Sequence, residues 1–190
     1  KIKALEKKAQ RFDEEASLTL GKIYFERQGT AKDYATAAKW FERAGDQGNV
    51  DAQYHLAGQY ERGWGVEQDT AKAFQLYKFA AEEGSKLAQV ALARFYEQGI
   101  SVDKNLTTAF KWYLKAAERG NAQAQIRVAE AYAAGSGVEK DAGESIRWYR
   151  EAGLQGANLS PRRMALIGDA YLAGRDTDMD RDEARKWYLK

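Results

Sequence analysis

A period of 36 residues constrains this chain more than any other feature of its sequence. Glycine, tyrosine and alanine each recur at that interval, and so does a further aromatic position. The four ladders are Gly48, Gly84, Gly120 and Gly156; Tyr24, Tyr60, Tyr96 and Tyr132; Ala16, Ala52, Ala88 and Ala124; and Phe41, Tyr77, Tyr113 and Tyr149. Positions that stay in phase this long indicate a solenoid, in which each unit is stable only when stacked on its neighbours.

The copy at residues 49–84 predicts a hairpin of two helices. Its segment 52–60 has apolar residues four apart, which places them on one face of a first helix. Gly63 and Gly65 tolerate backbone angles that other residues disfavour, so we expect the first helix to end there. Asp69 follows where an N-cap belongs and predicts the start of a second, antiparallel helix.

The recurring aromatic residues are predicted to form the core. A tryptophan-rich ladder runs directly before the aromatic rungs, at Trp40, Leu76, Trp112 and Trp148. Alanine rungs let helices approach closely, while tyrosine and tryptophan fill the larger spaces between units. We therefore expect the interior aromatic side chains to be buried rather than to bind a ligand.

Composition excludes several functional classes. The chain has 190 residues, with 30 Lys and Arg, 28 Asp and Glu and a formal net charge of +2. This balance argues against nucleic-acid binding, which needs a clustered basic face. There is no cysteine, so disulfides and thiolate metal sites are excluded. No apolar run reaches the roughly 18 residues of a membrane span, so we expect no transmembrane segment in this chain.

The sequence predicts no catalytic, cofactor or metal site. His55 is the only histidine, which leaves zinc without a ligand set, and no nucleophile elbow accompanies it. We expect His55 to lie on the surface or in a groove. Asp176, Asp178, Asp180 and Asp182 alternate in the last hinge, but the loop lacks the glycine and glutamate of an EF-hand calcium site. We therefore expect the protein to need no cofactor.

A set of matched positions recurs in phase in the second and fourth copies. In the second copy they are Leu56, Ala57, Tyr60, Gly63, Trp64, Gly65, Val66, Asp69, Ala71, Ala73, Tyr77, Ala80, Ala81 and Gly84. In the fourth they are Gly135, Ser136, Gly137, Val138, Asp141, Trp148, Tyr149, Ala152 and Gly156. This pattern resembles the Sel-1-like repeat, a relative of the tetratricopeptide repeat. The resemblance implies an all-α fold, a right-handed superhelical α-solenoid of about five stacked antiparallel helix pairs.

The period predicts a single array over residues 1–190. Repeats are expected at 13–48, 49–84, 85–120 and 121–156, after a segment 1–12 typical of the second helix of a preceding repeat. Residues 157–190 are expected to form a truncated last repeat, displaced by a three-residue insertion. Because neither end shows the polar outer face of a capping repeat, we expect the chain to be part of a longer protein.

The resemblance also implies a binding groove. In tetratricopeptide relatives, residues of the first helices line the concave face. The matching positions here are Lys22, Phe25, Tyr54, Glu61, Arg62, Arg94, Glu97 and Glu130. These positions vary from copy to copy while the ladders do not, as expected of a shared scaffold with a specialised binding face. Their mixture of aromatic residues and both charges suits a protein or peptide partner.

Two further places are candidate interfaces. Trp64 occupies a hinge tip, where it either anchors a partner or folds back over the adjacent hinge. Arg162 and Arg163 follow Pro161 at the insertion, where they either attract an acidic partner or pair with nearby acids in a lengthened turn. Ser160 and Pro161 are predicted to be the N-cap and the first residue of the last repeat's first helix.

The resemblance implies a non-enzymatic scaffold or adaptor for protein–protein interaction. Related proteins often serve bacterial cell-envelope assemblies, including exopolysaccharide secretion, which favours the bacterial periplasm or cell envelope as the location, with the cytoplasm as an alternative. Two other functions stay open. One is binding of carbohydrate or cell wall, as in cysteine-rich bacterial relatives, and the other is a regulatory adaptor in protein quality control.

Overall fold

The computed structural model describes residues 2–11, 13–27, 30–174 and 179–189, and over these ranges all regular secondary structure is helical. The predicted all-α fold is therefore confirmed. The chain divides into two compact units, Lys1–Lys104 and Asn105–Lys190, which we call unit 1 and unit 2. Within the described ranges, no helix is both long and apolar enough to cross a membrane.

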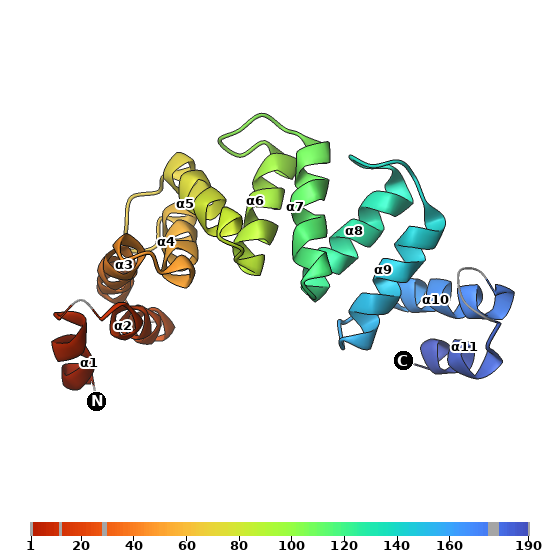
Figure 1. The fold of residues 1–190 in the computed structure, drawn as a ribbon, viewed down its shortest axis with the longest axis horizontal. Helices are drawn as coiled ribbons and strands as arrows, with labels where there is room; N and C mark the ends of the chain where they lie inside the picture. The colour runs from red at the N-terminus through yellow and green to blue at the C-terminus, as the bar shows by residue number, and fades with distance from the viewer. Residues whose placement is uncertain (1, 12, 28–29, 175–178, 190) are drawn as a thin grey trace. The chain divides into compact units, whose positions relative to one another are not determined.

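Unit 1 contains the first six helices, each packed against the next in chain order (Figure 1). They are α1 (Ile2–Ala9), α2 (Glu14–Glu26), α3 (Ala31–Asp46), α4 (Val50–Arg62), α5 (Thr70–Glu82) and α6 (Lys86–Gln98). The predicted hairpin of the second copy is the antiparallel pair α4 and α5. First helices also contact each other directly, as α2 and α4 do.

Unit 2 repeats the same plan. Its helices are α7 (Leu106–Glu118), α8 (Ala122–Ala134), α9 (Ala142–Leu154), α10 (Pro161–Ala173) and α11 (Arg181–Tyr188). Here α8 pairs with α9, and α10 pairs with α11, as the ribbon in Figure 1 shows. The hairpin is thus the common building block of both units.

The helix starts follow the 36-residue period because their capping residues do. Asp13, Asn49, Ser85 and Asn121 cap α2, α4, α6 and α8, and each side chain accepts a hydrogen bond of 2.9–3.3 Å from the backbone N–H three residues on. Asp69 caps α5 in the same way, 2.8 Å from the N–H of Lys72, as predicted. Each cap satisfies a free amide of the first turn and contributes about 1 kcal/mol.

The glycine hinge also behaves as predicted, for two different reasons. Gly63 has a φ of 69° and ends α4 in the left-handed conformation. Gly65, with a φ of 73°, lies against the start of α3, where an added Cβ would be 2.2 Å from the backbone N of Ala35. In the third copy Ser101 takes this position with a φ of 55°, and its hydroxyl donates to Thr70 Oγ1 at 2.8 Å.

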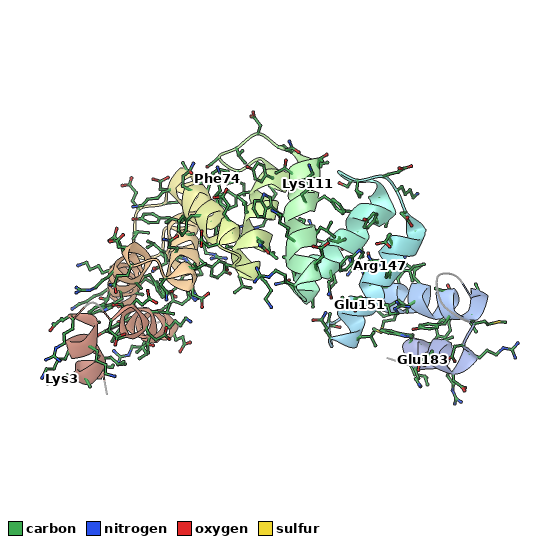
Figure 2. All side chains as sticks on the ribbon, viewed as in Figure 1. Lys3, Phe74, Lys111, Arg147, Glu151 and Glu183 are labelled. Carbon is green, nitrogen blue, oxygen red and sulfur yellow. The ribbon has the colours of Figure 1, made fainter. Side chains whose placement is uncertain are left out.

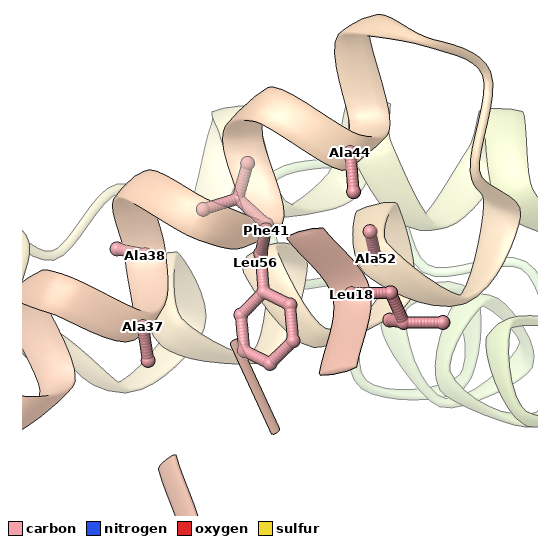
Figure 3. Close-up of a cluster of buried hydrophobic side chains, with 7 residues drawn as sticks. All are labelled: Leu18, Ala37, Ala38, Phe41, Ala44, Ala52 and Leu56. Atoms are coloured by element: carbon pink, nitrogen blue, oxygen red, sulfur yellow. The ribbon is translucent and has the colours of Figure 1, made fainter. Parts of the chain in front are cut away.

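One core cluster of unit 1 lies between helices α2, α3 and α4. Phe41 on α3 is completely buried, and Figure 3 shows it beside Leu56 of α4. The remaining buried members of this cluster are Leu18, Ala37, Ala38, Ala44 and Ala52. Small alanines on each helix leave room for the large ring, which agrees with the packing predicted from the ladders.

The predicted burial of the aromatic ladders needs one correction. The rungs Phe41, Tyr77, Tyr113 and Tyr149 are at most 6% exposed, but Tyr24, Tyr60, Tyr96 and Tyr132 are only half-buried. The second set lies in the last turns of first helices, where the phenol oxygen reaches polar neighbours. The Tyr60 hydroxyl accepts a hydrogen bond from Lys72 Nζ at 2.6 Å. Phe74, labelled in Figure 2, packs edge-on against the Tyr96 ring at 5.7 Å.

A glutamine ladder, which the sequence reasoning missed, links successive hairpins; Gln89 and Gln125 are buried, and Gln53 is half-buried. The Nε2 atoms of Gln53, Gln89 and Gln125 donate to the carbonyl oxygens of Gly45, Ala81 and Ala117, at 3.0, 3.2 and 3.2 Å. Each bond reaches a carbonyl oxygen near the end of a second helix that also accepts a hydrogen bond from the backbone N–H of the closing glycine, Gly48, Gly84 or Gly120. The 36-residue spacing of the glutamines was the available signal.

The insertion before the last repeat is partly buried. Pro161 is the first residue of α10 and Ser160 its N-cap, as predicted, but the Ser160 side chain makes no capping hydrogen bond. Leu159 is 3% exposed and contacts the position of Gly153 on α9, where an added Cβ would be 3.0 Å from Leu159 Cδ1. The inserted segment therefore contributes a core side chain to the last repeat.

Candidate functional site

Four of the eight predicted groove residues meet on one face of unit 1. The Glu61 carboxylate on α4 accepts a 2.6 Å hydrogen bond from Arg94 Nη2 on α6 and a 2.9 Å bond from the Tyr77 hydroxyl on α5. The Tyr54 ring lies 5.8 Å from the Tyr77 ring. Arg62 follows Glu61 at the end of α4. We call Tyr54, Glu61, Arg62, Tyr77 and Arg94 the polar cluster.

Sequence reasoning found most of the polar cluster but placed Tyr77 only in the core. Tyr77 is 3% exposed, yet its hydroxyl reaches the edge of the cluster and donates to Glu61. The spacing of the tyrosine ladder does not indicate this second role, because the side chains opposite the ladder position differ from repeat to repeat. The clue was Glu61, one period before Glu97 and on the same predicted face.

Burial makes the Glu61 interactions stronger than those of an ordinary surface pair. The Glu61 side chain is 14% exposed and that of Arg94 is 32% exposed. A charge-assisted hydrogen bond in such surroundings is roughly twice as strong as a neutral one. Arg94 also lies 5.2 Å from the Phe95 ring centroid, which limits its conformations. The pair therefore fixes α6 against α4 at the polar cluster.

Both tyrosines of the cluster remain protonated at neutral pH. Burial first, and then the charge of Glu61, raises the pKa of Tyr77 far above its ordinary range. Burial also raises the pKa of Tyr54, while the positive charge of Arg62 opposes it. Each hydroxyl can thus donate a hydrogen bond, and the Tyr54 hydroxyl lies within the field of Arg62.

Trp64 folds back onto unit 1, which was one of its two predicted outcomes. Its ring stacks on Tyr34 of α3 with centroids 5.5 Å apart, and lies 5.9 Å from Phe25 of α2. The guanidinium of Arg62 lies 4.8 Å from the ring centroid, in a cation–π contact. The indole remains 38% exposed. Trp64 therefore orients Arg62 while keeping part of its own surface accessible.

His55 and Phe25 join the same aromatic cluster. The imidazole of His55 is half-buried and stacks on Phe41 at 5.0 Å with an interplanar angle of 14°. Burial, followed by the nearby positive charge of Lys22, lowers the pKa of His55. Lys22 itself is 3.9 Å from the Asp51 carboxylate. His55 is therefore a neutral packing residue beside Tyr54 at physiological pH.

Glu97 and Glu130 complete the predicted groove set. Glu97 is half-buried on α6, one turn after Arg94, in unit 1. Glu130 is on α8 in unit 2, and pairs with Arg127 at 2.8 Å and with Arg163 of α10. Seven of the eight predicted groove residues therefore lie in unit 1, and Glu130 lies in unit 2.

The pairing of Arg163 with Glu130 agrees with the second of its two predicted outcomes, in which the arginine pairs with a nearby acid. Besides its bond to Glu130, the Arg163 guanidinium lies 5.3 Å from the Tyr149 ring centroid. Arg127 lies in the same way 5.5 Å from the Tyr113 ring centroid. Unit 2 thus holds one carboxylate between two arginines. Arg162 is exposed, beside this arrangement in the chain.

Among the described residues, no group of three or more histidine, cysteine or acidic side chains is arranged to hold a metal ion. Asp176 and Asp178 lie outside the described residues. The Asp180 side chain accepts hydrogen bonds from the backbone N–H groups of Asp182 and Glu183, so it caps α11. The alternating aspartates are thus partly explained by helix capping.

The Sel1 repeat family model matches the chain at residues 15–49, 50–85, 86–121, 122–156 and 163–190. This confirms the resemblance inferred from the ladders. A sequence search among curated proteins finds no match.

Solved structures show the same relationship. The chain is 34% identical to a protective antigen present in uropathogenic Escherichia coli strains that displays an SLR fold, with a TM-score of 0.85. That match covers 100% of this chain and 40% of the antigen, so this chain spans less than half of that relative. A Sel1 repeat protein from Oxalobacter formigenes is 30% identical over 93% of this chain and 71% of its own, with a TM-score of 0.78. Helicobacter pylori cysteine rich protein B, at 23% identity, a TM-score of 0.55 and coverage of 69% of this chain and 94% of its own, shares the fold.

Proposed function

Because this chain belongs to the Sel1 repeat family, we propose that it is a non-enzymatic scaffold that binds a protein partner through the polar cluster of unit 1. Proteins built from such repeats generally act as interaction scaffolds. The observation that carries the proposal for this chain is the convergence of Tyr54, Glu61, Arg62 and Arg94 on one face.

The polar cluster is organised before a partner arrives. Glu61 is held by Tyr77 and Arg94, and Arg62 is held by Trp64. Side chains that are already ordered lose little conformational entropy on binding, so more of the contact energy appears as affinity. Arginine and tyrosine are also the residue types most enriched where binding energy concentrates.

The cluster is specific to its place in the array. The positions one period after Tyr54 and Arg62 are Val90 and Gln98, so the next repeat does not reproduce the same face. The recurring alanine, glycine and aromatic residues keep the hairpins stacked, whichever residues occupy the positions equivalent to Tyr54 and Arg62. This division supports a partner that recognises one particular part of the array rather than each repeat equally.

We further propose a bacterial cell-envelope setting, in the periplasm or at the envelope, where the scaffold would hold an assembly such as an exopolysaccharide secretion complex. The support is the 34% identical relative described as a protective antigen of uropathogenic Escherichia coli. Fractionation of cells that produce the native protein, with detection in periplasmic and membrane fractions, tests the location, and recovery in the cytoplasm alone would contradict it.

The binding function is tested with a partner captured from the native host, identified and then purified. We expect the double change Tyr54→Ala and Arg94→Glu to weaken binding at least about 100-fold, the loss expected when two central interface residues are removed. Lys78→Glu, an exposed change on the second helix α5, is the matched control and should leave affinity unchanged. Circular dichroism must show that both variants remain folded.

Carbohydrate binding is the outcome that would contradict this function. Retention of the protein on a cell-wall or polysaccharide resin, unaffected by the double change, would place binding elsewhere and with another class of ligand. Equal binding of the purified partner by the wild type and the double variant would also contradict the proposal, because it would move the protein interface away from the polar cluster.

A further inference from the structure

One position of the first helices carries a charged residue in the first, third and fourth copies and glycine in the second copy. The residues, spaced by 36, are Lys22, Gly58, Arg94 and Glu130. Each charged member faces an opposite charge on another first helix: Lys22 faces Asp51, Arg94 pairs with Glu61, and Glu130 pairs with Arg163. Only the second copy, with Gly58, lacks this charge.

Gly58 leaves a space beside a guanidinium. A Cβ added to Gly58 would lie 3.3 Å from Arg62 Nη1 and 3.4 Å from the Tyr77 hydroxyl oxygen. Those two groups therefore border the position that a side chain occupies in the other copies. The φ of Gly58 is ordinary for a helix, so the backbone does not require glycine here.

Arg62 has no carboxylate partner among the described residues of unit 1. Its side chain lies against Trp64. The adjacent acid, Glu61, is already bonded to both Tyr77 and Arg94. Arg62 is exposed, so its N–H groups are accessible to a ligand that approaches this face.

In unit 2 the position equivalent to Gly58 is an acid, Glu130, and it pairs with arginines. Glu130 lies between Arg127 and Arg163, and each of these guanidinium groups lies near a tyrosine ring. In unit 1 the guanidinium of Arg62 lies against the ring of Trp64, but Gly58 supplies no carboxylate to pair with it. A carboxylate from outside would complete the arrangement.

We propose that an aspartate or glutamate side chain of an extended peptide partner docks over Gly58 and pairs with Arg62. The neutral hydroxyl of Tyr54, close enough to Arg62 to feel its charge, borders the same site. A carboxylate with one negative charge fits better than a phosphate, because the negative Glu61 is next to the site and would repel a dianion. This inference rests on the proposed protein-binding function and specifies the chemistry of the partner.

The probe is a phage-displayed library of random dodecapeptides, selected in parallel on the wild type and on Arg62→Gln. We expect the wild type to enrich peptides with an acidic residue at one fixed position, and Arg62→Gln to lose that preference. A synthetic copy of the selected peptide should bind about tenfold more weakly to Arg62→Gln, and about tenfold more weakly when its own acid is changed to the amide. Combining both changes should add little further loss, because both remove one interaction.

Two variants of Gly58 give an independent test. Gly58→Glu supplies an acid one helical turn before Arg62, so it should compete with the peptide and weaken binding about tenfold. Gly58→Gln fills the same space without charge and should weaken binding less. Neither change should destabilise α4, because both replace glycine inside a helix.

The possible results separate this inference from the function it rests on. Three results would overturn the carboxylate site alone. The first is enrichment of peptides that share no acidic position, and the second is an acid preference that stays unchanged in Arg62→Gln. The third is tighter binding of the selected peptide when phosphoserine replaces its acidic residue. Failure of the wild type to enrich any peptide would contradict the carboxylate site, whereas equal binding of the purified partner by the wild type and the double variant Tyr54→Ala and Arg94→Glu would contradict the proposed protein-binding function. Equal effects of Gly58→Glu and Gly58→Gln would show that only space, and not charge, matters here.

Discussion

Glu61 on α4 and Arg94 on α6, which belong to successive repeats, form a 2.6 Å ion pair. The Glu61 carboxylate also accepts a hydrogen bond from the Tyr77 hydroxyl. The pair lies across the contact between two hairpins and not within one helix. It therefore contributes both to the stacking of unit 1 and to the shape of its proposed binding face.

Glu61→Gln is expected to destabilise the protein by about 1–3 kcal/mol, because it removes a charge-assisted hydrogen bond from a largely buried group. The amide keeps the size of the side chain, so the loss reports the charge. The free energy of unfolding in urea measures it. The control is Glu82→Gln on α5, where the side chain is exposed and the change should be within about 0.5 kcal/mol. Equal losses in the two variants would contradict a special role for Glu61.

Tyr77 is expected to limit stability at alkaline pH. Burial and Glu61 raise the pKa of Tyr77 above its ordinary value of 10.0, so the folded state keeps a proton that the unfolded chain releases. Stability from this group is therefore complete below about pH 10 and decreases as the pH rises above that value. Tyr77→Phe keeps the ring and removes the titration.

The measurement is the unfolding free energy of both proteins at about pH 8 and about pH 11. At the lower pH the phenylalanine variant should be about 1 kcal/mol less stable, because it loses the hydrogen bond to Glu61. The difference should shrink or reverse at the higher pH. An equal difference at both values would show that Tyr77 titrates normally.

The regular part of the fold could be predicted because each element has a local cause. Asp69 caps α5 and Gly63 ends α4, and both effects depend on residues a few positions apart in the chain. Repetition of these signals at 36 residues made the hairpins visible without any knowledge of tertiary contacts.

The site could be predicted only in outline. The resemblance to tetratricopeptide relatives implied that Glu61, Arg62 and Arg94 share one face, but it did not indicate which arginine pairs with Glu61. That choice depends on side-chain directions and on Tyr77, which approaches from α5. The position of Trp64 likewise depends on the ring of Tyr34 in the preceding hairpin. Such contacts exist only after the hairpins have stacked.

The glutamine ladder gives a test of a feature that the sequence reasoning overlooked. Gln89 is 4% exposed and donates to the Ala81 carbonyl. Gln89→Glu would remove that donor and bury a negative charge against a carbonyl oxygen, so we expect a loss of about 2–5 kcal/mol at neutral pH. The loss should be smaller at low pH, where the acid is protonated. Gln98→Glu, at an exposed position on the same helix, should have little effect on urea unfolding.

The two glycines Gly65 and Gly48 separate close packing from backbone conformation. Both have positive φ, 73° and 91°, so replacement by alanine strains the backbone at either site by about 1–2 kcal/mol. At Gly48 an added Cβ meets nothing within 4 Å, whereas at Gly65 it would lie 2.2 Å from the Ala35 nitrogen.

Gly48→Ala should therefore cost only the backbone strain, while Gly65→Ala must also push the hinge away from α3. We expect the second variant to lose at least about 2 kcal/mol more, by the same reasoning as for an overpacked core. Because the hinge carries Trp64, its indole should also leave Tyr34, with a change in tryptophan fluorescence that Gly48→Ala does not show. Equal unfolding free energies for the two variants would mean that the hinge can move at no cost, and that Trp64 is not fixed by the stacking of the repeats.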